Sequence, residues 1–279
     1  MFVHQTKYFK LAGVQVWFPQ RVEDVGPILD QAPVVMLWQC PANLVREFNP
    51  WVFRSRPFHT PLIDLTRSEE ELWNELETKS CRYEIRKAQK MDCVVSLNEE
   101  IEAARLLIND SIRRLRYRHQ MDEEQWQALL PDHDIFLCRW QGTPVAVHVL
   151  LRDFPGRARL LLSGSEDRAN QRFRGIVGPS NRLLHWYELK NYKARAFHLY
   201  DFGGCDAPKA SPPSSISQFK LSFGGEVVAE PILYLAENPA LRTVLRGLGY
   251  ARNALRRMPW PESWLQAVRT TPKLGDLFR

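Results

Sequence analysis

The sequence predicts an α+β fold in which helices flank a mixed, mainly antiparallel sheet. Two apolar strand candidates, 134–140 and 144–151, are joined by a Gln-Gly-Thr turn of the kind that closes a hairpin. A third strand candidate covers 159–162, and a polar, glycine-containing segment separates it from a helix at 182–193 and the strand FHLYDF. With 279 residues, 44% of them hydrophobic, the chain is long and apolar enough to bury a large core.

The region before this core also shows strand and helix signals. Residues 33–39 are β-branched or aromatic and bounded by proline, which predicts a strand without a catalytic motif. Ser68 and Glu71 form an S-x-x-E capping box, which predicts a helix that continues to Lys90. A strand at 94–97 and a helix at 99–115 should follow.

The chain should divide into an N-terminal lobe at 1–60, a main domain at 61–235 and a C-terminal amphipathic helix with a tail at 236–279. Asn238 and Pro239 are a natural N-cap and first helical residue. The helix carries an apolar stripe decorated by arginines, and it either packs on the protein's own core, which we favour, or rests on a membrane surface. The stripe contains Leu241, Val244, Leu245, Leu248 and Leu255, and Trp260 and Trp264 follow it.

Charge and cysteine content narrow the class of protein. The formal net charge of +6 favours anionic partners such as nucleotides, tRNA or lipid headgroups, without choosing among them. The five cysteines are scattered and lack a C-x-x-C pair, which argues against disulfides and against a metal site. No signal peptide and no run of about 18 apolar residues is present. We therefore expect a cytoplasmic protein, with peripheral membrane contact as one option.

One loop has the features of a phosphate seat. The segment QRFRGIVGPSN, residues 171–181, lies between a predicted strand and a predicted helix. Backbone N–H groups at a helix start, close approach at Gly175 and Gly178, and the side chains of Arg172 and Arg174 would suit a phosphate or pyrophosphate. An exposed turn between two elements explains the same pattern equally well.

A second candidate is the basic face of the helix that ends at Lys90. Arg82, Arg86 and Lys90 stand at i, i+4 and i+8, so they share one side of the helix. Such a face can bind a polyanion, although most basic stripes are solvated surface. Spacing alone therefore assigns no function to it.

Two ordered signatures stand out, first IDLTRSEEELWNELETKSCRYEIRKAQK and then YDFGG followed by QFKLSFGGE. They resemble signatures of the FemAB-like proteins, which belong to the GNAT superfamily of acyltransferases. The resemblance covers about 62–230. It implies a GNAT-like sheet, and it allows an arrangement of two pseudo-repeated GNAT-like lobes. The loop at Arg172 loosely resembles the one by which GNAT proteins hold the pyrophosphate of coenzyme A.

The resemblance also implies roles for individual residues. Lys220 would lie near the reacting centre and neutralise a phosphate or the charge of the transition state, unless it is a surface lysine at a strand start. Asp201 would orient the acceptor amine or act as its base, and capping of the following glycine turn is the equal alternative. The substrate-binding set would be Arg82, Arg86, Tyr200, Gly203, Gly204, Phe219 and Phe223.

The resemblance thus implies an N-acyltransferase of cell-envelope biosynthesis. It would transfer an acyl or aminoacyl group from acyl-CoA or aminoacyl-tRNA, used as a co-substrate and not as a tightly bound cofactor. The acceptor would be an amine of a nucleotide- or lipid-linked amino sugar or of a cell-wall peptide, and no DNA partner is expected. No coiled-coil arm between Asp92 and Asp134 is evident, which leaves room for acyl-CoA as donor. The competing hypothesis is a basic module that binds tRNA or an envelope precursor without turnover.

Overall fold

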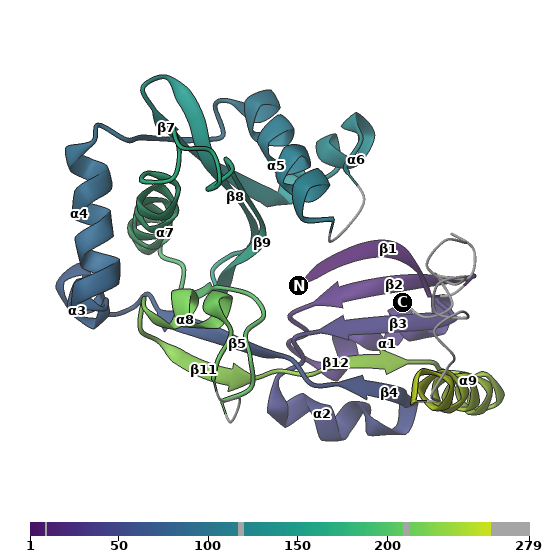
Figure 1. Ribbon diagram of the computed structural model, residues 1–279. Helices are drawn as coiled ribbons and strands as arrows, with labels where there is room; N and C mark the ends of the chain where they lie inside the picture. Colours follow the sequence, from purple (N-terminus) through teal and green to yellow (C-terminus); the bar gives the residue numbers. More distant parts are fainter. Residues whose placement is uncertain (9, 117–119, 209–211, 258–279) are drawn as a thin grey trace. The chain divides into compact units, whose positions relative to one another are not determined.

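The computed structural model describes residues 1–8, 10–116, 120–208 and 212–257, and it shows two compact units (Figure 1). The first unit comprises Met1–Phe58 together with Glu230–Arg279, and the second unit comprises His59–Ala229. The C-terminal segment therefore belongs to the same unit as the N-terminal lobe. The reason lies in strand pairing, because a strand from the C-terminal segment inserts between two N-terminal strands.

The first unit contains a five-stranded sheet in the order β1-β2-β3-β12-β4. Only β2 and β3 are parallel, and the other pairs are antiparallel. The strands are β1 (Phe2–Tyr8), β2 (Leu11–Trp17), β3 (Val34–Trp38), β4 (Val52–Arg56) and β12 (Ile232–Leu235). The helical segments are α1 (Val22–Gln31), α2 (Ala42–Phe48), the 3-10 turn Asn49–Trp51 and α9 (Pro239–Arg257).

Alternation along β3 gives this sheet two apolar faces. Val35 and Leu37 pack with residues of α1 and α2, whereas Val34 and Met36 point to the opposite face, which Leu245 of α9 covers. Successive side chains of a strand point to opposite sides, so a continuous apolar run is buried on both. The predicted strand at 33–39 is confirmed as a central strand.

The second unit contains a seven-stranded sheet in the order β11-β5-β10-β9-β8-β7-β6, in which only the β9–β10 pair is parallel. The strands are β5 (His59–Asp64), β6 (Val94–Leu97), β7 (His133–Trp140), β8 (Thr143–Asp153), β9 (Arg157–Ser165), β10 (Leu199–Asp201) and β11 (Glu226–Ala229). Both sheets are mixed and mainly antiparallel and both are flanked by helices, so the predicted α+β fold class is confirmed.

Helices cover both faces of the second sheet (Figure 1). Phe136 and Cys138 of β7 face the core that contains α4 and α7, whereas Ile135 and Leu137 face α5. The helices are α3 (Glu69–Glu75), α4 (Tyr83–Lys90), α5 (Ile101–Leu115), α6 (Glu123–Gln127), α7 (Val177–Ala194) and α8 (Ser215–Leu221), with a π-helical turn at Thr78–Arg82 and a 3-10 turn at Leu130–Asp132. The helix α7 is therefore buried between α4 and the sheet.

The helix predicted from Ser68 to Lys90 is divided in the structure. The capping box of Ser68 and Glu71 is confirmed, because Ser68 accepts from the Glu71 N–H at 3.1 Å and the Glu71 carboxylate accepts from the Ser68 N–H at 2.8 Å. The single helix expected from there to Lys90 is wrong. Leu76 and Glu77 are extended, and the helix restarts at the π-helical turn.

The C-terminal helix packs on the protein itself along one side. Asn238 caps it by accepting from the Leu241 N–H at 3.0 Å, and Leu241 and Leu245 join the core of the first unit. Val244 and Leu248, by contrast, are 57% and 49% exposed. Residues Trp260 and Trp264 lie outside the described residues. Of the helices in the described residues, none combines the length and hydrophobicity needed to span a membrane.

Candidate active site

A cavity of about 750 Å³ lies within the second unit, between the end of α5, strand β9, the loop after β10, and α8. Its wall includes Gly203, Gly204, Phe219 and Lys220, four of the residues predicted for the site. The two sequence signatures YDFGG and QFKLSFGGE therefore meet in one cavity, although Gly204 and Phe219 are 15 positions apart in the chain.

Lys220 joins the two signatures directly. Its Nζ donates to the carbonyl oxygen of Gly204 at 2.6 Å. The lysine lies on α8, which Ser214 caps by accepting from the Ser217 N–H at 3.2 Å, so the alternative of a lysine at a strand start is wrong. Burial, followed by the nearby Arg159, lowers the pKa of Lys220 to about 8, although Asp201 opposes the shift. The side chain therefore remains mostly an ammonium at neutral pH, a donor suited to a developing negative charge.

Asp201 is buried and holds the glycine turn. Its Oδ1 accepts from the Gly203 N–H at 2.7 Å and from the Thr60 hydroxyl, and its Oδ2 accepts from Arg157 at 3.2 Å. These contacts match the alternative role, in which Asp201 caps the glycine turn. Asp201 is not among the described residues that line the cavity, so its role as a base stays a prediction without a contact to the site.

The glycines of both signatures occupy backbone conformations that other residues avoid. Gly203 has φ +69°, and a Cβ there would lie 3.1 Å from the Leu160 carbonyl oxygen. Gly225 has φ +82°, and its Cβ would lie 2.4 Å from the Leu62 carbonyl oxygen. Gly203 therefore allows a close backbone approach at the cavity wall, whereas Gly225 lets the turn before β11 approach β5.

The aromatic residues predicted for the substrate site divide into two groups. Phe219 lines the cavity, with the Arg182 guanidinium 4.6 Å from its ring centre. Phe223 and Tyr200 are fully buried, and neither is among the described lining residues. Phe223 packs edge-on against His185 with ring centres 5.1 Å apart. Direct substrate contact is thus supported by position for Phe219 alone.

A buried polar network lies behind the cavity wall, and sequence reasoning missed it. Glu188 of α7 contacts Nδ1 of His148 at 2.7 Å through Oε1, and Nδ1 of His185 at 3.1 Å through Oε2. The Tyr200 hydroxyl lies 2.5 Å from Glu188 Oε2 and 2.7 Å from His185 Nδ1. Asn181 contacts Nε2 of His148 at 3.2 Å. The sequence signal was present: a His-x-x-Glu pair on one face of a predicted helix.

Burial and mutual contact set the ionisation of this network. Burial, followed by the neighbouring His148, lowers the pKa of His185 to about 4, so His185 is neutral at neutral pH. Burial raises the pKa of Glu188, but the two histidines outweigh it together and hold that pKa below its usual range. Burial, followed by Glu188, raises the pKa of Tyr200 well above its usual value. The Glu188 carboxylate is therefore surrounded by hydrogen-bond donors that are neutral or cationic.

In the described residues, His148, His185 and Glu188 are the one group of three or more His, Cys, Asp or Glu side chains whose potential metal-ligating atoms converge, all within 4.8 Å of one another. Their contacts of 2.7 and 3.1 Å are hydrogen-bond distances, and each carboxylate oxygen already has a hydrogen-bond partner. Hydrogen bonds account for the cluster, so we assign it no metal.

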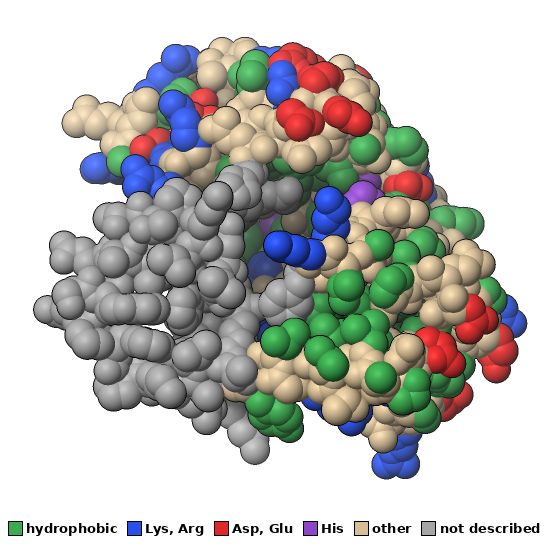
Figure 2. All heavy atoms as spheres, turned by 90° about the vertical axis from the view of Figure 1, so that its right-hand side faces the viewer, with side chains coloured by type: hydrophobic (Ala, Val, Ile, Leu, Met, Phe, Trp, Pro, Cys, Tyr) green, Lys and Arg blue, Asp and Glu red, His purple; other side chains and the backbone are tan. Residues whose placement is uncertain are grey.

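The cavity is polar on one side and carries an excess of positive charge. Four of its lining residues are cationic and two are acidic: Arg114, Arg159, Arg168 and Lys220, against Glu166 and Asp167. Over the face shown in Figure 2, in contrast, basic and acidic side chains are interspersed. The cationic side chains of the cavity would favour an anionic group of a substrate.

The predicted phosphate loop lies elsewhere. Arg172 donates to the Thr143 hydroxyl at 3.1 Å and lies over the Phe173 ring, whereas Arg174 and Gly175 are exposed. Gly178 is in the first turn of α7, where a Cβ would lie 3.4 Å from the Glu84 carboxylate. None of these loop residues is among the described residues that line the cavity.

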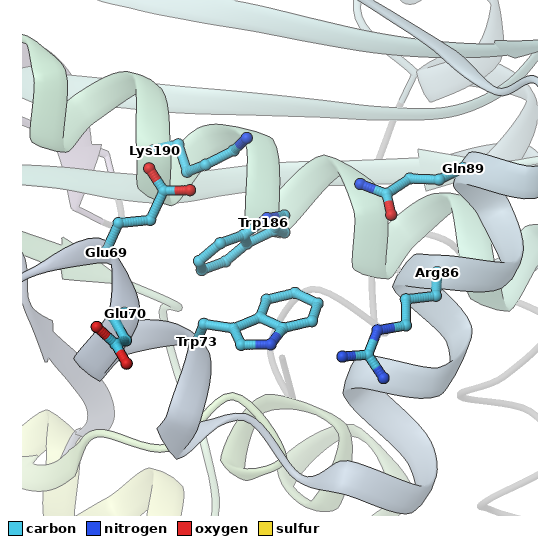
Figure 3. A pocket seen from close by; sticks show the side chains of 7 residues that line it. All are labelled: Glu69, Glu70, Trp73, Arg86, Gln89, Trp186 and Lys190. Carbon is cyan, nitrogen blue, oxygen red and sulfur yellow. The ribbon is translucent and has the colours of Figure 1, made fainter.

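Arg86 belongs to a second, smaller cavity of about 540 Å³, and this cavity shares no described lining residue with the first. Figure 3 shows its two tryptophans side by side, with Arg86 and Lys190 reaching in from α4 and α7. The ring centres of Trp73 and Trp186 are 4.9 Å apart, and Arg86 lies 5.4 Å from the Trp73 ring. Arg82 instead donates to the Thr78 hydroxyl. The roles of both arginines in substrate binding stay predictions.

Comparisons with known proteins identify solved structures that have a similar fold. No family model and no curated protein sequence matches the chain. Among solved structures, FemX is similar with a TM-score of 0.64 at 14% identity, over 86% of this chain and 85% of that one. L-PGS from Bacillus licheniformis is similar with a TM-score of 0.57 at 12% identity, over 88% of this chain and 84% of that one. A C-terminal domain ascribed to a lysylphosphatidylglycerol synthetase of Agrobacterium fabrum has a TM-score of 0.57 at 12% identity, over 87% and 83%.

These similarities cover 86% and 88% of the chain, which is more than the second unit, His59–Ala229, contains. They therefore extend over both units. At such low identity they establish the fold alone. The chain therefore has a fold similar to that of FemX, which agrees with the resemblance of the two sequence signatures to FemAB-like proteins.

Proposed function

We propose that the protein is an N-acyltransferase that joins an acyl or aminoacyl group to an amine in the cavity that contains Lys220. The observation that carries the proposal is the bond between the Lys220 ammonium and the Gly204 carbonyl, which unites the two signatures at a cavity with a positive excess. Amide formation from an ester or thioester needs a positioned amine and donors directed at the developing oxyanion. Lys220 and Arg159, both on the cavity wall, are suited to the second task.

The donor that we favour is an aminoacyl ester, as on tRNA, and not acyl-CoA. The loop expected to hold the coenzyme A pyrophosphate has the Glu84 carboxylate beside Gly178, and Glu84 also binds Arg182 at 2.6 Å. A carboxylate at the first turn of α7 competes with an anion for the same helix start. FemX and L-PGS share this fold, which supports the choice. The acceptor would be an amine of a nucleotide- or lipid-linked amino sugar or of a cell-wall peptide, and the site of action would be the cytoplasm or the membrane surface facing it.

The test is a panel of aminoacyl-tRNAs and acyl-CoAs, each combined with nucleotide-linked amino sugars and peptide amines and analysed by mass spectrometry. Wild-type protein should form an amide product, and Lys220→Ala should lower kcat by about 10²–10³-fold, the loss expected when an oxyanion donor is removed. Lys190→Ala is the matched control, because Lys190 lies on α7 of the same unit but lines the other cavity.

Three results are informative against the proposal. Consumption of no donor by the wild-type protein rejects the enzyme hypothesis. Binding of tRNA or precursor without turnover supports the competing hypothesis of a basic binding module. Turnover that requires acyl-CoA overturns our choice of donor.

A further inference from the structure

The buried network of His148, His185, Glu188 and Tyr200 has one atom with access to the cavity. His185 is only 2% exposed, yet it is one of the residues that line the cavity. Its Nδ1 is engaged by Glu188 and Tyr200. No partner for its Nε2 is found within the described part of the chain, and that nitrogen is not among the fully buried polar atoms without a partner. Nε2 is therefore the nitrogen that the cavity can reach.

The hydrogen-bond partners of His148 determine which of its ring nitrogens carry hydrogen. The amide nitrogen of Asn181 donates to the Val177 carbonyl at 2.7 Å, so the amide oxygen faces His148 and can only accept. Nε2 of His148 therefore carries a hydrogen. Its Nδ1, at 2.7 Å from the Glu188 carboxylate, must also donate, because a carboxylate has no hydrogen to give.

The same logic fixes the tautomer of His185. The Tyr200 hydroxyl donates its one hydrogen to Glu188 Oε2. His185 Nδ1 faces both that carboxylate oxygen at 3.1 Å and the phenol oxygen at 2.7 Å, and both can accept from it. If Nδ1 carried no hydrogen, its lone pair would face a lone pair of the Glu188 carboxylate, and the two would repel each other. Nδ1 therefore carries the hydrogen of the neutral ring, and the lone pair lies on Nε2 at the cavity wall.

We propose that His185 is the proton-transfer catalyst of this site, with Glu188 and Tyr200 as positioning residues that hold its tautomer. The proposal rests on the acyl transfer proposed above and names a further residue that performs it. A carboxylate that orients the far nitrogen of an imidazole, so that the near nitrogen faces the reacting group, is a recurrent arrangement for moving protons in acyl transfer.

The proton balance of the step is complete. The neutral acceptor amine attacks the carbonyl carbon of the ester or thioester donor, and a C–N bond forms. Nε2 takes one N–H proton from that nitrogen as the bond forms. The resulting imidazolium returns the proton to the leaving oxygen or sulfur as the C–O or C–S bond breaks. The products are an amide and a free hydroxyl or thiol, and His185 ends neutral.

The first experiment needs no substrate. In the full-length protein labelled with ¹⁵N-histidine, long-range ¹H–¹⁵N spectra at pH 7 should show His185 as a neutral ring with hydrogen on Nδ1 and a bare Nε2. The signal is assigned from its absence in His185→Gln or, if that variant does not fold, from ring contacts with Phe202 and Phe223. A ring protonated on Nε2, or a stoichiometric divalent metal in the purified protein, would overturn the proposal.

The second experiment uses the donor and acceptor that the wild-type protein converts. His185→Gln should lower kcat by about 10²–10⁴-fold with little change in KM, the range typical for loss of a general base. Glu188→Gln should also lower kcat and should shift hydrogen from Nδ1 to Nε2 in the histidine spectrum, a change that a purely structural role would not produce.

His133→Gln is the matched control, because His133 is also buried in the second unit but is not among the described lining residues. An unchanged kcat in His185→Gln overturns the proposal. If the wild-type protein converts no pair, acyl transfer itself is rejected, and the spectra still decide whether His185 presents a bare nitrogen to the cavity.

Discussion

The two units use the same layered construction but bury different chemistry. Each has a sheet with helices on both faces and apolar residues that alternate along its strands. Of the buried polar residues that the structure describes, only Gln39 and Glu230 belong to the first unit. The second unit buries many, and His148, His185 and Glu188 lie directly between α7 and its sheet.

Burying a charge costs free energy, and a stable fold can form without buried charges. The first unit attains its core with almost no such groups. The second unit keeps them next to the cavity that also contains Lys220, where perturbed pKa values are common in active sites. The reaction that we propose would therefore take place in the second unit.

The largest expected effect is loss of Glu188, whose carboxylate bonds to both histidines. Glu188→Ala should lower the free energy of unfolding of the second unit by about 3–5 kcal/mol, the usual cost of removing one partner of a buried ion pair. Urea denaturation followed by hydrogen exchange in each unit measures it. In the first unit, Gln39 donates to Glu230 at 3.2 Å, and Gln39→Ala should cost only about 1–3 kcal/mol. Equal losses would contradict the contrast between the units.

Acid should weaken the second unit selectively. The folded-state pKa of His185, about 4, lies below its unfolded value of 6.5, so the unfolded chain binds a proton that the folded chain does not. Stability therefore falls as pH drops from 6.5 to 4, by on the order of 3 kcal/mol for this group. The lowered pKa of Glu188 acts in the same direction below its unfolded value of 4.5.

Urea midpoints for each unit between pH 7.5 and 4 measure this dependence. His185→Gln should remove most of the slope between pH 6.5 and 4. A slope that survives in this variant would assign the dependence to other groups and would weaken the account of the network.

Local sequence signals predicted much of the second unit. Periodicity located β6 and α5, and the capping box of Ser68 was found from four letters of sequence. The sequence predicted only part of the candidate site. The family signatures led to Lys220, but the convergence of His148 on β8 with Glu188 on α7 depends on how α7 lies over the sheet, which no local pattern encodes.

The rest of the fold depends on contacts between residues that are distant in the sequence, which local patterns do not reveal. The strand β12 pairs with β3 and β4, almost 200 residues earlier in the chain, so the C-terminal segment could not be assigned to the N-terminal unit from its composition. The helix break at Leu76 and Glu77 was missed for a similar reason, because the Glu77 N–H donates to the carbonyl of Ser222 at 2.8 Å. A contact distant in sequence there replaces the local helical bond.

Glycine substitutions sharpen the comparison at the level of the backbone. Gly225→Ala should cost more than the roughly 1–2 kcal/mol of a left-handed residue, because the new Cβ also meets the Leu62 carbonyl at 2.4 Å. Gly247 in α9 of the first unit is exposed, and nothing beyond its chain neighbours and its own helix backbone lies within 4 Å of its Cβ position, so Gly247→Ala should stabilise by about 0.5–1 kcal/mol. Thermal unfolding of both variants checks the opposite signs. A stabilising Gly225→Ala would mean that the turn before β11 is not held against β5.

The smallest effect concerns how the helices begin. In the second unit Ser68 caps α3 through its side chain, whereas α1 of the first unit begins at Arg21 without a side-chain cap bond. Ser68→Ala should therefore cost about 1 kcal/mol, because the Glu71 N–H loses its acceptor. Arg21→Ala is the control, since it removes no capping bond and should leave the unfolding midpoint of the first unit almost unchanged. Equal shifts in the two variants would show that the capping box contributes nothing specific, and that α3 depends on the packing of Leu72 alone.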